Sequence, residues 1–188
     1  MDEIAENTKA IDLDIKELEK FQTIIAAAET DDELGTVLRL HLAVEQLLVF
    51  YIKEKSHGET SKYAKSPRDF GGKLSLATAF GLPIPIARAI YQINVIRNKL
   101  AHDPDASVQD GDLKELARAV NSLSEIDKNF TPIEKRYIEL AVKRPGERLV
   151  FGAGGNRIDF VICAFSFYAT TMQWLIKDAA YRKLQSKC

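Results

Sequence analysis

Residues 32 to 56 contain the feature that most restricts the fold of this chain, a long helical pattern that is apolar over a wide arc. The arc is formed by two adjoining stripes: Val37, Leu40, Val44, Leu47 and Tyr51, and Leu34, Leu38, His41, Glu45, Leu48 and Ile52. A helix that is apolar over so wide an arc must be largely buried, and it therefore needs several neighbouring helices around it. Asp31 and Asp32 precede the pattern and supply an N-cap with favourable charge in the first turn.

Six further segments have patterns that predict these neighbours. They cover residues 11 to 28, 72 to 80, 86 to 101, about 110 to 123, 131 to 142 and 158 to 185. Thr131-Pro132-Ile133-Glu134 matches a capping box with proline at the first helical position, and Gly81 matches a helix C-cap. RPGERLVFGAGGNR, just before the last helix, predicts a break that could hold a small hairpin. The pattern therefore indicates an all-α, up-and-down bundle of about six to seven helices.

Length and composition agree with one soluble domain over residues 1–188, with frayed residues 1–10. Hydrophobic residues make up 46% of the chain and charged residues 28%, which is ordinary for a globular protein. The acidic N-terminus lacks the features of a secretion signal, and the uncharged run 160–176 falls short of the roughly 20 residues of a membrane span. With only Cys163 and Cys188, we expect a cytoplasmic protein without a disulfide framework, metal, cofactor or membrane partner.

Charge is unevenly distributed along the chain. Residues 1–34 hold 11 acids and 3 lysines, a net charge of −8, so the remaining 154 residues carry +7 of the total of −1. A local basic excess extends from Lys53 to Lys73 and includes Lys62, Lys65 and Arg68. It could contact a phosphate backbone, although such runs are equally often solvated connections.

The sequence RNKLAH, at the end of the helix predicted for residues 86–101, places a cation, an amide and an imidazole within six residues. Its reactive members are Arg97, Asn98 and His102, with Lys99 between them. Asp103-Pro104 should end the helix near His102, because the residue before proline disfavours the helical conformation. In a continuous helix Arg97 and His102 would be about 140° apart, whereas at a helix end the imidazole can turn toward the arginine.

His41 and Glu45 are polar residues within an apolar stripe, and a buried carboxylate is costly unless it is paired. One interpretation is that they satisfy each other or a backbone group. The other, which we favour, is that Glu45 meets a cation from another helix. Arg97 is the expected cation, because it occupies a core-facing position after Ile86, Ile90 and Ile93. Alternatively, Arg97 has only a structural role, in which its ion pair with Glu45 joins the two helices and His102 serves as a helix cap.

Several other kinds of site are disfavoured. GAGG at 152–155 lacks the GK[ST] of a phosphate-binding loop and is interpreted as a turn. The three histidines and two cysteines match no metal-ligand spacing, and no GxSxG element is present. Residues 76–90 superficially match a helix-turn-helix, but the second helix is nearly all apolar, so direct DNA reading is not expected.

RNA cleavage is the chemistry that RNKLAH fits best. Cleaving RNA without metal requires activation of the 2′-hydroxyl, stabilisation of the phosphorane and protonation of the leaving 5′-oxygen. His102 can transfer protons, Arg97 can bind phosphate bidentately, and Asn98 can orient either group. Because one histidine is fewer than this reaction usually requires, a two-fold dimer would supply the second.

The motif resembles that of the HEPN superfamily, in which arginine and a polar residue, often asparagine, are followed by three residues and then histidine. Glu45 in HLAVEQLL resembles the acid on the family's long early helix, and FGGKLSLATAFGL ahead of IRNKLAHD resembles the mannitol operon repressor branch. The resemblance covers residues 32–125. It implies a helical bundle that dimerises with both motifs facing one cleft.

Two functions follow from the resemblance. The first is a metal-independent endoribonuclease of the toxin or phage-defence type, in which Arg97, Asn98 and His102 are catalytic and Glu45 and His41 support them. Lys99, Lys62, Lys65, Arg68 and Lys73 would contact RNA, and a cognate antitoxin would be a partner. The second is a non-catalytic regulatory module of the mannitol operon repressor kind, which binds a regulatory protein.

Overall fold

The computed structural model describes residues 21–103 and 105–185, and this part of the chain is mostly α-helical, as predicted. Its helices are α2 (Phe21–Glu29), α3 (Glu33–Lys55), α4 (Phe70–Ala79), α5 (Ile84–His102), α6 (Asp110–Asn121) and α7 (Asn156–Gln185). The strands β1 (Tyr137–Leu140) and β2 (Arg144–Val150) form one hairpin, and short 3-10 helices cover Gly58–Lys62, Ser122–Glu125 and Ile133–Lys135. Residues 1–10, which are predicted to be frayed, and the first half of the helix predicted from residue 11 lie outside the described residues.

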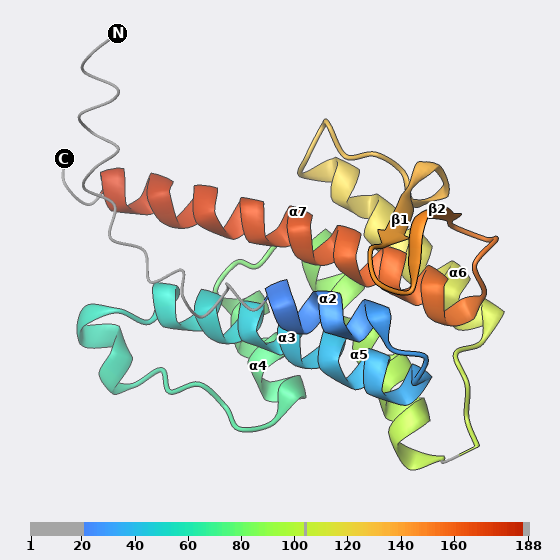
Figure 1. Cartoon of the computed structure of the whole chain (residues 1–188). Coiled ribbons are helices and arrows are strands. Elements are labelled where there is room, and N and C mark those ends of the chain that lie inside the picture. Colours follow the sequence, from blue (N-terminus) through green and yellow to red (C-terminus); the bar gives the residue numbers. More distant parts are fainter. Residues whose placement is uncertain (1–20, 104, 186–188) are drawn as a thin grey trace, which may run out of the picture.

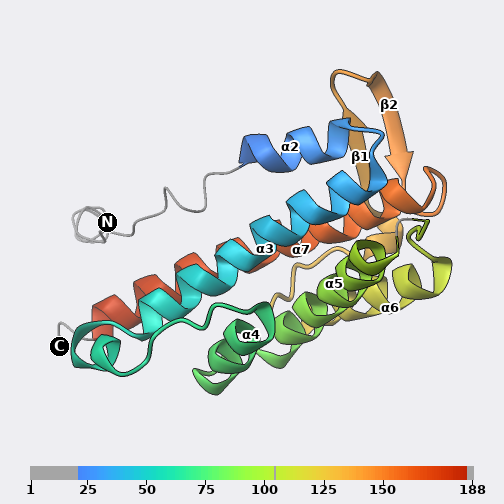
Figure 2. The same cartoon turned by 90° about the horizontal axis from the view of Figure 1, so that it is seen from below.

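The central element is α3, which packs against α2, α4, α5 and α7 (Figures 1 and 2). The stripe from Val37 to Tyr51 is buried throughout, while Leu34 at the start of the other stripe is 40% exposed. Phe50 lies outside both predicted stripes and is also buried. Burial around most of the helix confirms that the apolar arc of α3 forms the centre of the core.

The helices are not arranged strictly up and down, which corrects one prediction. Asn156 at the start of α7 donates from Nδ2 to Asp110 Oδ1 at the start of α6 (2.9 Å). At the start of α7, Arg157 donates to Ala28 O at the end of α2, just before α3 begins, and near the end of α7, Arg182 donates to Glu54 O at the end of α3. The long segment between α6 and α7 therefore returns the chain to the same end of the bundle, so that α3, α6 and α7 run in the same direction (Figure 1).

The helix predicted for residues 131–142 is wrong. The capping-box residues serve other contacts, since Asn121 Oδ1 accepts from Ile133 N (2.8 Å) and its Nδ2 donates to Glu134 Oε1 (3.0 Å). After one 3-10 turn the chain enters β1, which pairs antiparallel with β2. Glu29 of α2 accepts from Val142 N and Lys143 N at the hairpin tip. Tertiary contacts thus override the local capping signal.

The other predicted boundaries agree with the structure to within a few residues. Asp32 caps α3, Gly81 adopts φ +88 after α4, and α5 ends at His102. The N-cap of α6 is Gln109, and Asp110 and Asp112 lie in its first turn. GAGG forms a turn, in which Gly152 N donates to Asp159 Oδ1 (2.8 Å).

Two helices, α3 and α7, are long and apolar enough to cross a membrane by length and composition alone. Within their most apolar 18-residue windows, 61% and 72% of the residues are buried inside the bundle. Such burial is typical of the core helices of a globular protein.

The cap of α3 gives a stability prediction. Asp32 accepts from Gly35 N (2.9 Å), so Asp32→Ala should lower the free energy of unfolding by about 1 kcal/mol. Asp32→Asn, which retains an accepting oxygen, should stay within a few tenths of a kcal/mol of the wild type. Urea unfolding followed by circular dichroism measures both. Equal losses in the two variants would show that the cap contributes nothing specific.

Candidate functional site

A polar cluster lies where α3, α4 and α5 meet. We define it as His41 and Glu45 on α3, Lys73 on α4, and Asn94 and Arg97 on α5. His41 and Glu45 are one turn apart on α3, as Asn94 and Arg97 are on α5. The cluster is therefore built from two facing helix turns, with α4 closing one side.

Within the cluster, Glu45 pairs with Lys73, which corrects the predicted pair between Glu45 and Arg97. Lys73 Nζ donates to Glu45 Oε1 at 2.6 Å and to Arg68 O at 2.8 Å. The two side chains are only 12% and 20% exposed, for Lys73 and Glu45 respectively. This pair attaches α4 to α3, and Lys73 is therefore removed from the set of predicted RNA contacts.

His41 is buried and joins α3 to α5. Its Nε2 lies 3.1 Å from Asn94 Oδ1, so the ring donates from Nε2 to the amide oxygen. On one side the ring packs against Phe70, with 4.3 Å between ring centroids. Burial lowers the pKa of His41, and the nearby Arg97 lowers it further, against the opposing effects of Asn94 and Glu45. The net effect favours the neutral form of His41.

Arg97 has no carboxylate partner in the part of the chain that the structure describes. Its Nη1 donates to Asn98 Oδ1 (2.9 Å), and its Nε is buried without a hydrogen-bond partner. The side chain is only partly exposed. A partly desolvated guanidinium whose charge is not neutralised favours a bound anion, and its fork matches phosphate or carboxylate.

His102 is the last residue of α5 and is exposed. Among the described residues, its ring has no hydrogen-bond or ion-pair partner. Asn98 lies one turn earlier and orients Arg97. Lys99 is exposed and pairs with Asp112 of α6 (2.6 Å). The structure therefore places Arg97, Asn98 and His102 along the last two turns of α5, with Arg97 partly inside and His102 at the surface.

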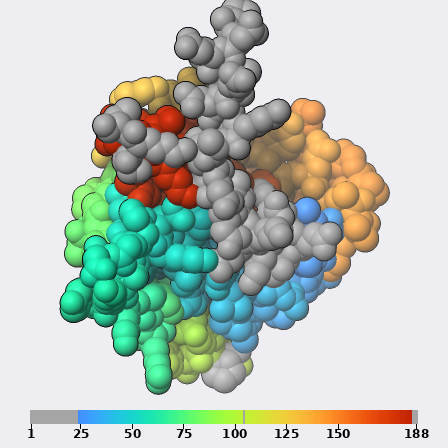
Figure 3. Space-filling model, turned by 90° about the vertical axis from the view of Figure 1, so that its left-hand side faces the viewer, coloured from blue at the N-terminus to red at the C-terminus, as the bar shows by residue number. Residues whose placement is uncertain are grey.

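The basic connection between α3 and α4 forms part of the molecular surface (Figure 3). Lys65 and Arg68 are exposed there. Lys62 is exposed as well and is paired with Glu59 (2.8 Å). The connection leads directly into α4, where Phe70 packs against His41. A path of contacts therefore links the basic connection to the turn of α5 that carries Arg97.

Sequence reasoning missed two members of this site. Asn94 precedes Arg97 by three residues and Asn98 by four, so helical spacing alone could have found it. Phe70 gave no such signal, because its contact with His41 depends on how α4 packs. Within the described residues, no three His, Cys, Asp or Glu side chains are grouped so that they could hold a metal ion.

No protein-family model, curated protein or solved structure matches this chain at a significant level.

The lowered pKa of His41 predicts a pH-dependent stability. Below about pH 6.5 the histidine of the unfolded chain binds a proton that the folded chain accepts only at lower pH, so the free energy of unfolding falls as pH decreases. Between about pH 7.5 and pH 5, wild type should therefore lose more stability than His41→Gln, which cannot titrate. Denaturant unfolding across this range measures the difference, and the exposed His57→Gln is the control. If the free energy of unfolding changes with pH to the same extent in wild type and His41→Gln, the predicted role of His41 is wrong.

The revised partner of Glu45 can be tested by double-mutant cycles. Glu45→Gln should cost about 1–3 kcal/mol, because it leaves a desolvated lysine without its counter-ion. Glu45→Gln combined with Lys73→Met should show a coupling energy of about 1 kcal/mol or more, and Glu45→Gln with Arg97→Met less than about 0.5 kcal/mol. A larger coupling energy for Glu45 with Arg97 than for Glu45 with Lys73 would show that Arg97 is the partner of Glu45.

Proposed function

We propose that this chain is an HEPN-like, metal-independent endoribonuclease that acts as a homodimer. The observation that carries the proposal is Arg97, a partly buried guanidinium with an unpartnered Nε and no carboxylate partner within the described residues. Glu45, the acid predicted to neutralise it, is instead engaged by Lys73. A phosphodiester group would supply the missing negative charge.

The residues divide the reaction between them. Arg97 binds the phosphate and stabilises the extra negative charge of the phosphorane, while Asn98 holds the guanidinium in place. His102 is exposed at the helix end, where it can exchange protons with substrate or water. The 2′-oxygen loses its proton and attacks phosphorus, the bond to the 5′-oxygen breaks, and that oxygen takes up a proton. The products are a 2′,3′-cyclic phosphate and a 5′-hydroxyl.

A second copy of the chain completes this site. One proton transfer removes the 2′-hydroxyl proton and another protonates the leaving oxygen, and each chain contributes one histidine at the end of α5. Two copies related by a two-fold axis would present two His102 rings and two Arg97 guanidinium groups to one strand. Lys65 and Arg68 would then bind flanking phosphates.

The alternative proposal is a non-catalytic interaction module of the mannitol operon repressor kind. The outer face of α5 supports it, because Ile84 and Tyr91 are 58% and 59% exposed there. Exposed apolar side chains of this size are common at protein–protein contacts. In this case, binding of a regulatory protein would survive His102→Ala and be lost with Tyr91→Ser.

The ribonuclease proposal predicts the behaviour of three variants. His102→Ala should reduce cleavage of a mixed RNA pool by about 100-fold or more, because it removes a proton-transfer group. Arg97→Ala should do the same, and Arg97→Lys should not restore activity, since an ammonium lacks the planar fork. Sequencing gels of RNA incubated in excess EDTA, with detection of 2′,3′-cyclic phosphate ends, measure the reaction.

His57→Ala is the matched control for these variants, because His57 is exposed and its contact is a backbone one, to Glu54 O. It should cleave RNA within about twofold of the wild type. Circular dichroism and light scattering check that fold and oligomeric state are retained. Wild-type protein that leaves every RNA pool intact, or His102→Ala protein that cleaves at the wild-type rate, would overturn the proposal.

A further inference from the structure

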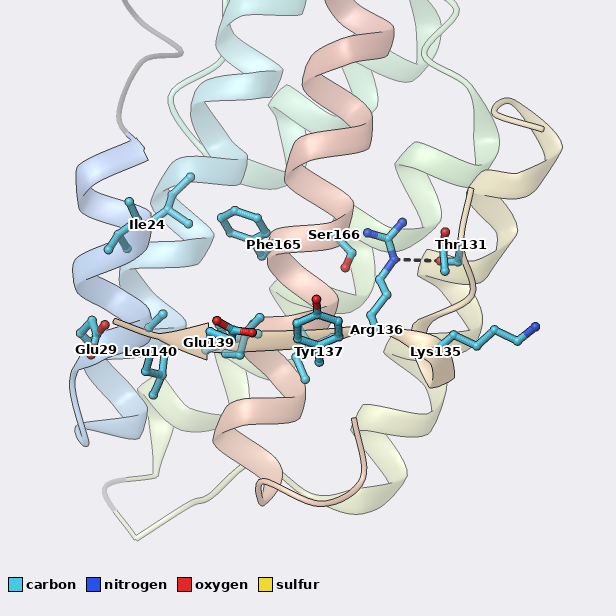
Figure 4. A pocket seen from close by; sticks show the side chains of 15 residues that line it. Ile24, Glu29, Thr131, Lys135, Arg136, Tyr137, Glu139, Leu140, Phe165 and Ser166 are labelled. Atoms are coloured by element: carbon cyan, nitrogen blue, oxygen red, sulfur yellow. Dashed lines mark hydrogen bonds between the residues drawn. The ribbon is translucent and has the colours of Figure 1, made fainter. Parts of the chain in front are cut away.

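A second site lies on the other side of α3, where α2, β1 and α7 enclose a pocket of about 440 Å³ (Figure 4). Pockets that bind small molecules occupy roughly 300–1,000 Å³. No residue of the polar cluster and no residue of RNKLAH lines this pocket. It is therefore separate from the proposed ribonuclease site, and the inference below does not depend on that proposal.

The walls of the pocket are mainly apolar. Side chains from all three elements contribute, namely Ile24, Ile25 and Ala28 of α2, Ile138 and Leu140 of β1, and Val161, Ile162 and Phe165 of α7. Two of them remain open to solvent, since Ile25 is 54% and Phe165 is 36% exposed. Apolar side chains left open around a cavity of this size favour an occupant with a hydrocarbon or aromatic body.

The two acidic residues of the pocket are already engaged. Glu29 accepts from Val142 N at 3.0 Å and from Lys143 N at 3.1 Å. Glu139 accepts from Arg148 Nε at 3.1 Å. Both carboxylates therefore hold the hairpin in place, and Glu139 is neutralised by Arg148.

Arg136 has unused donors at the same pocket. Its Nε donates to the Thr131 carbonyl at 2.8 Å, and its Cζ lies 4.7 Å from the Phe130 ring centroid. These contacts fix the guanidinium, while its terminal nitrogens have no acceptor among residues 21–103 and 105–185. Burial lowers the pKa of Arg136, and the nearby charge of Asp127 opposes this only in part. The exposed Lys135 also lines the pocket without a described partner.

We propose that this pocket binds a small amphipathic carboxylate, with its anionic group against Arg136 and its apolar body between α2, β1 and α7. A carboxylate matches the guanidinium fork and supplies the acceptor that the terminal nitrogens lack. The guanidinium, which is held by its contacts with Thr131 and Phe130, lies at the end of the pocket away from α2, where it can meet the anionic group (Figure 4).

Binding of decanoate, compared with decan-1-ol, tests the proposal. The two probes have the same hydrocarbon chain and differ in charge at one end. In calorimetric titrations of the full chain below the micelle concentration, decanoate should bind about tenfold or more tightly than decan-1-ol. Arg136→Gln should weaken decanoate binding by about tenfold and change decan-1-ol binding by less than about twofold.

Two further variants make the result interpretable. Arg144→Gln removes the same charge from β2, outside the pocket lining, where Arg144 is exposed and paired with Glu147 (3.5 Å); it should bind decanoate like the wild type. Ile25→Glu places a negative charge at the pocket on an exposed helix position and should weaken decanoate binding by repulsion. It therefore tests the proposal independently, should Arg136→Gln fail to fold. Equal affinities for the two probes, no binding of decanoate, or unchanged decanoate binding by whichever of Arg136→Gln and Ile25→Glu folds would overturn the proposal.

Discussion

Burial of α3 is the constraint on which the rest of the structure depends. A helix that is apolar around most of its circumference cannot lie at the surface, so four other helices pack around it. Their packing accounts for the core, and hydrogen bonds fix the start of α7 to the end of α2 and the end of α7 to the end of α3. It also determines which polar side chains are withdrawn from water, because His41 and Glu45 lie within the same helix.

The polar residues of α3 explain the unusual state of Arg97. His41 hydrogen-bonds to Asn94, and Glu45 is neutralised by Lys73, so both are satisfied without the arginine. Arg97 is nevertheless partly buried at the same junction, and among the described residues only Asn98 hydrogen-bonds to its guanidinium. A buried cation without a counter-ion is unfavourable unless an anion binds it. This charge at the helix junction is the feature that supports the proposed phosphate site.

The two proposed sites lie on different sides of α3 and use arginine in similar ways. At each site one guanidinium donates a hydrogen bond to an oxygen of the protein, which is Asn98 Oδ1 for Arg97 and Thr131 O for Arg136. Each guanidinium also has N–H groups that donate to no acceptor among the described residues. They differ in surroundings. Arg97 lies among polar side chains on the helix that ends at the exposed His102, whereas Arg136 borders an apolar pocket, which suits a hydrocarbon body.

The sequence by itself determined the elements whose signals are local and periodic. The apolar stripes of α3, the Asp32 cap, the end of α5 at His102 and the long α7 follow from helical spacing, capping chemistry and the effect of proline on its neighbour. Arg97, Asn98 and His102 could be singled out for the same reason, because a motif within six residues of one helix is a local pattern.

Only the tertiary structure decided features that depend on which elements meet. Glu45 could have paired with any nearby cation, and the packing of α4 selected Lys73 instead of Arg97. Thr131 to Glu134 carried a sound helix-start signal, yet Asn121 and Glu29 engage that region and its hairpin, so strands form there. The direction of α7 and the pocket beside Arg136 follow from the same hairpin. Contacts between residues far apart in the chain leave no periodic trace, and so they could not be predicted from the sequence.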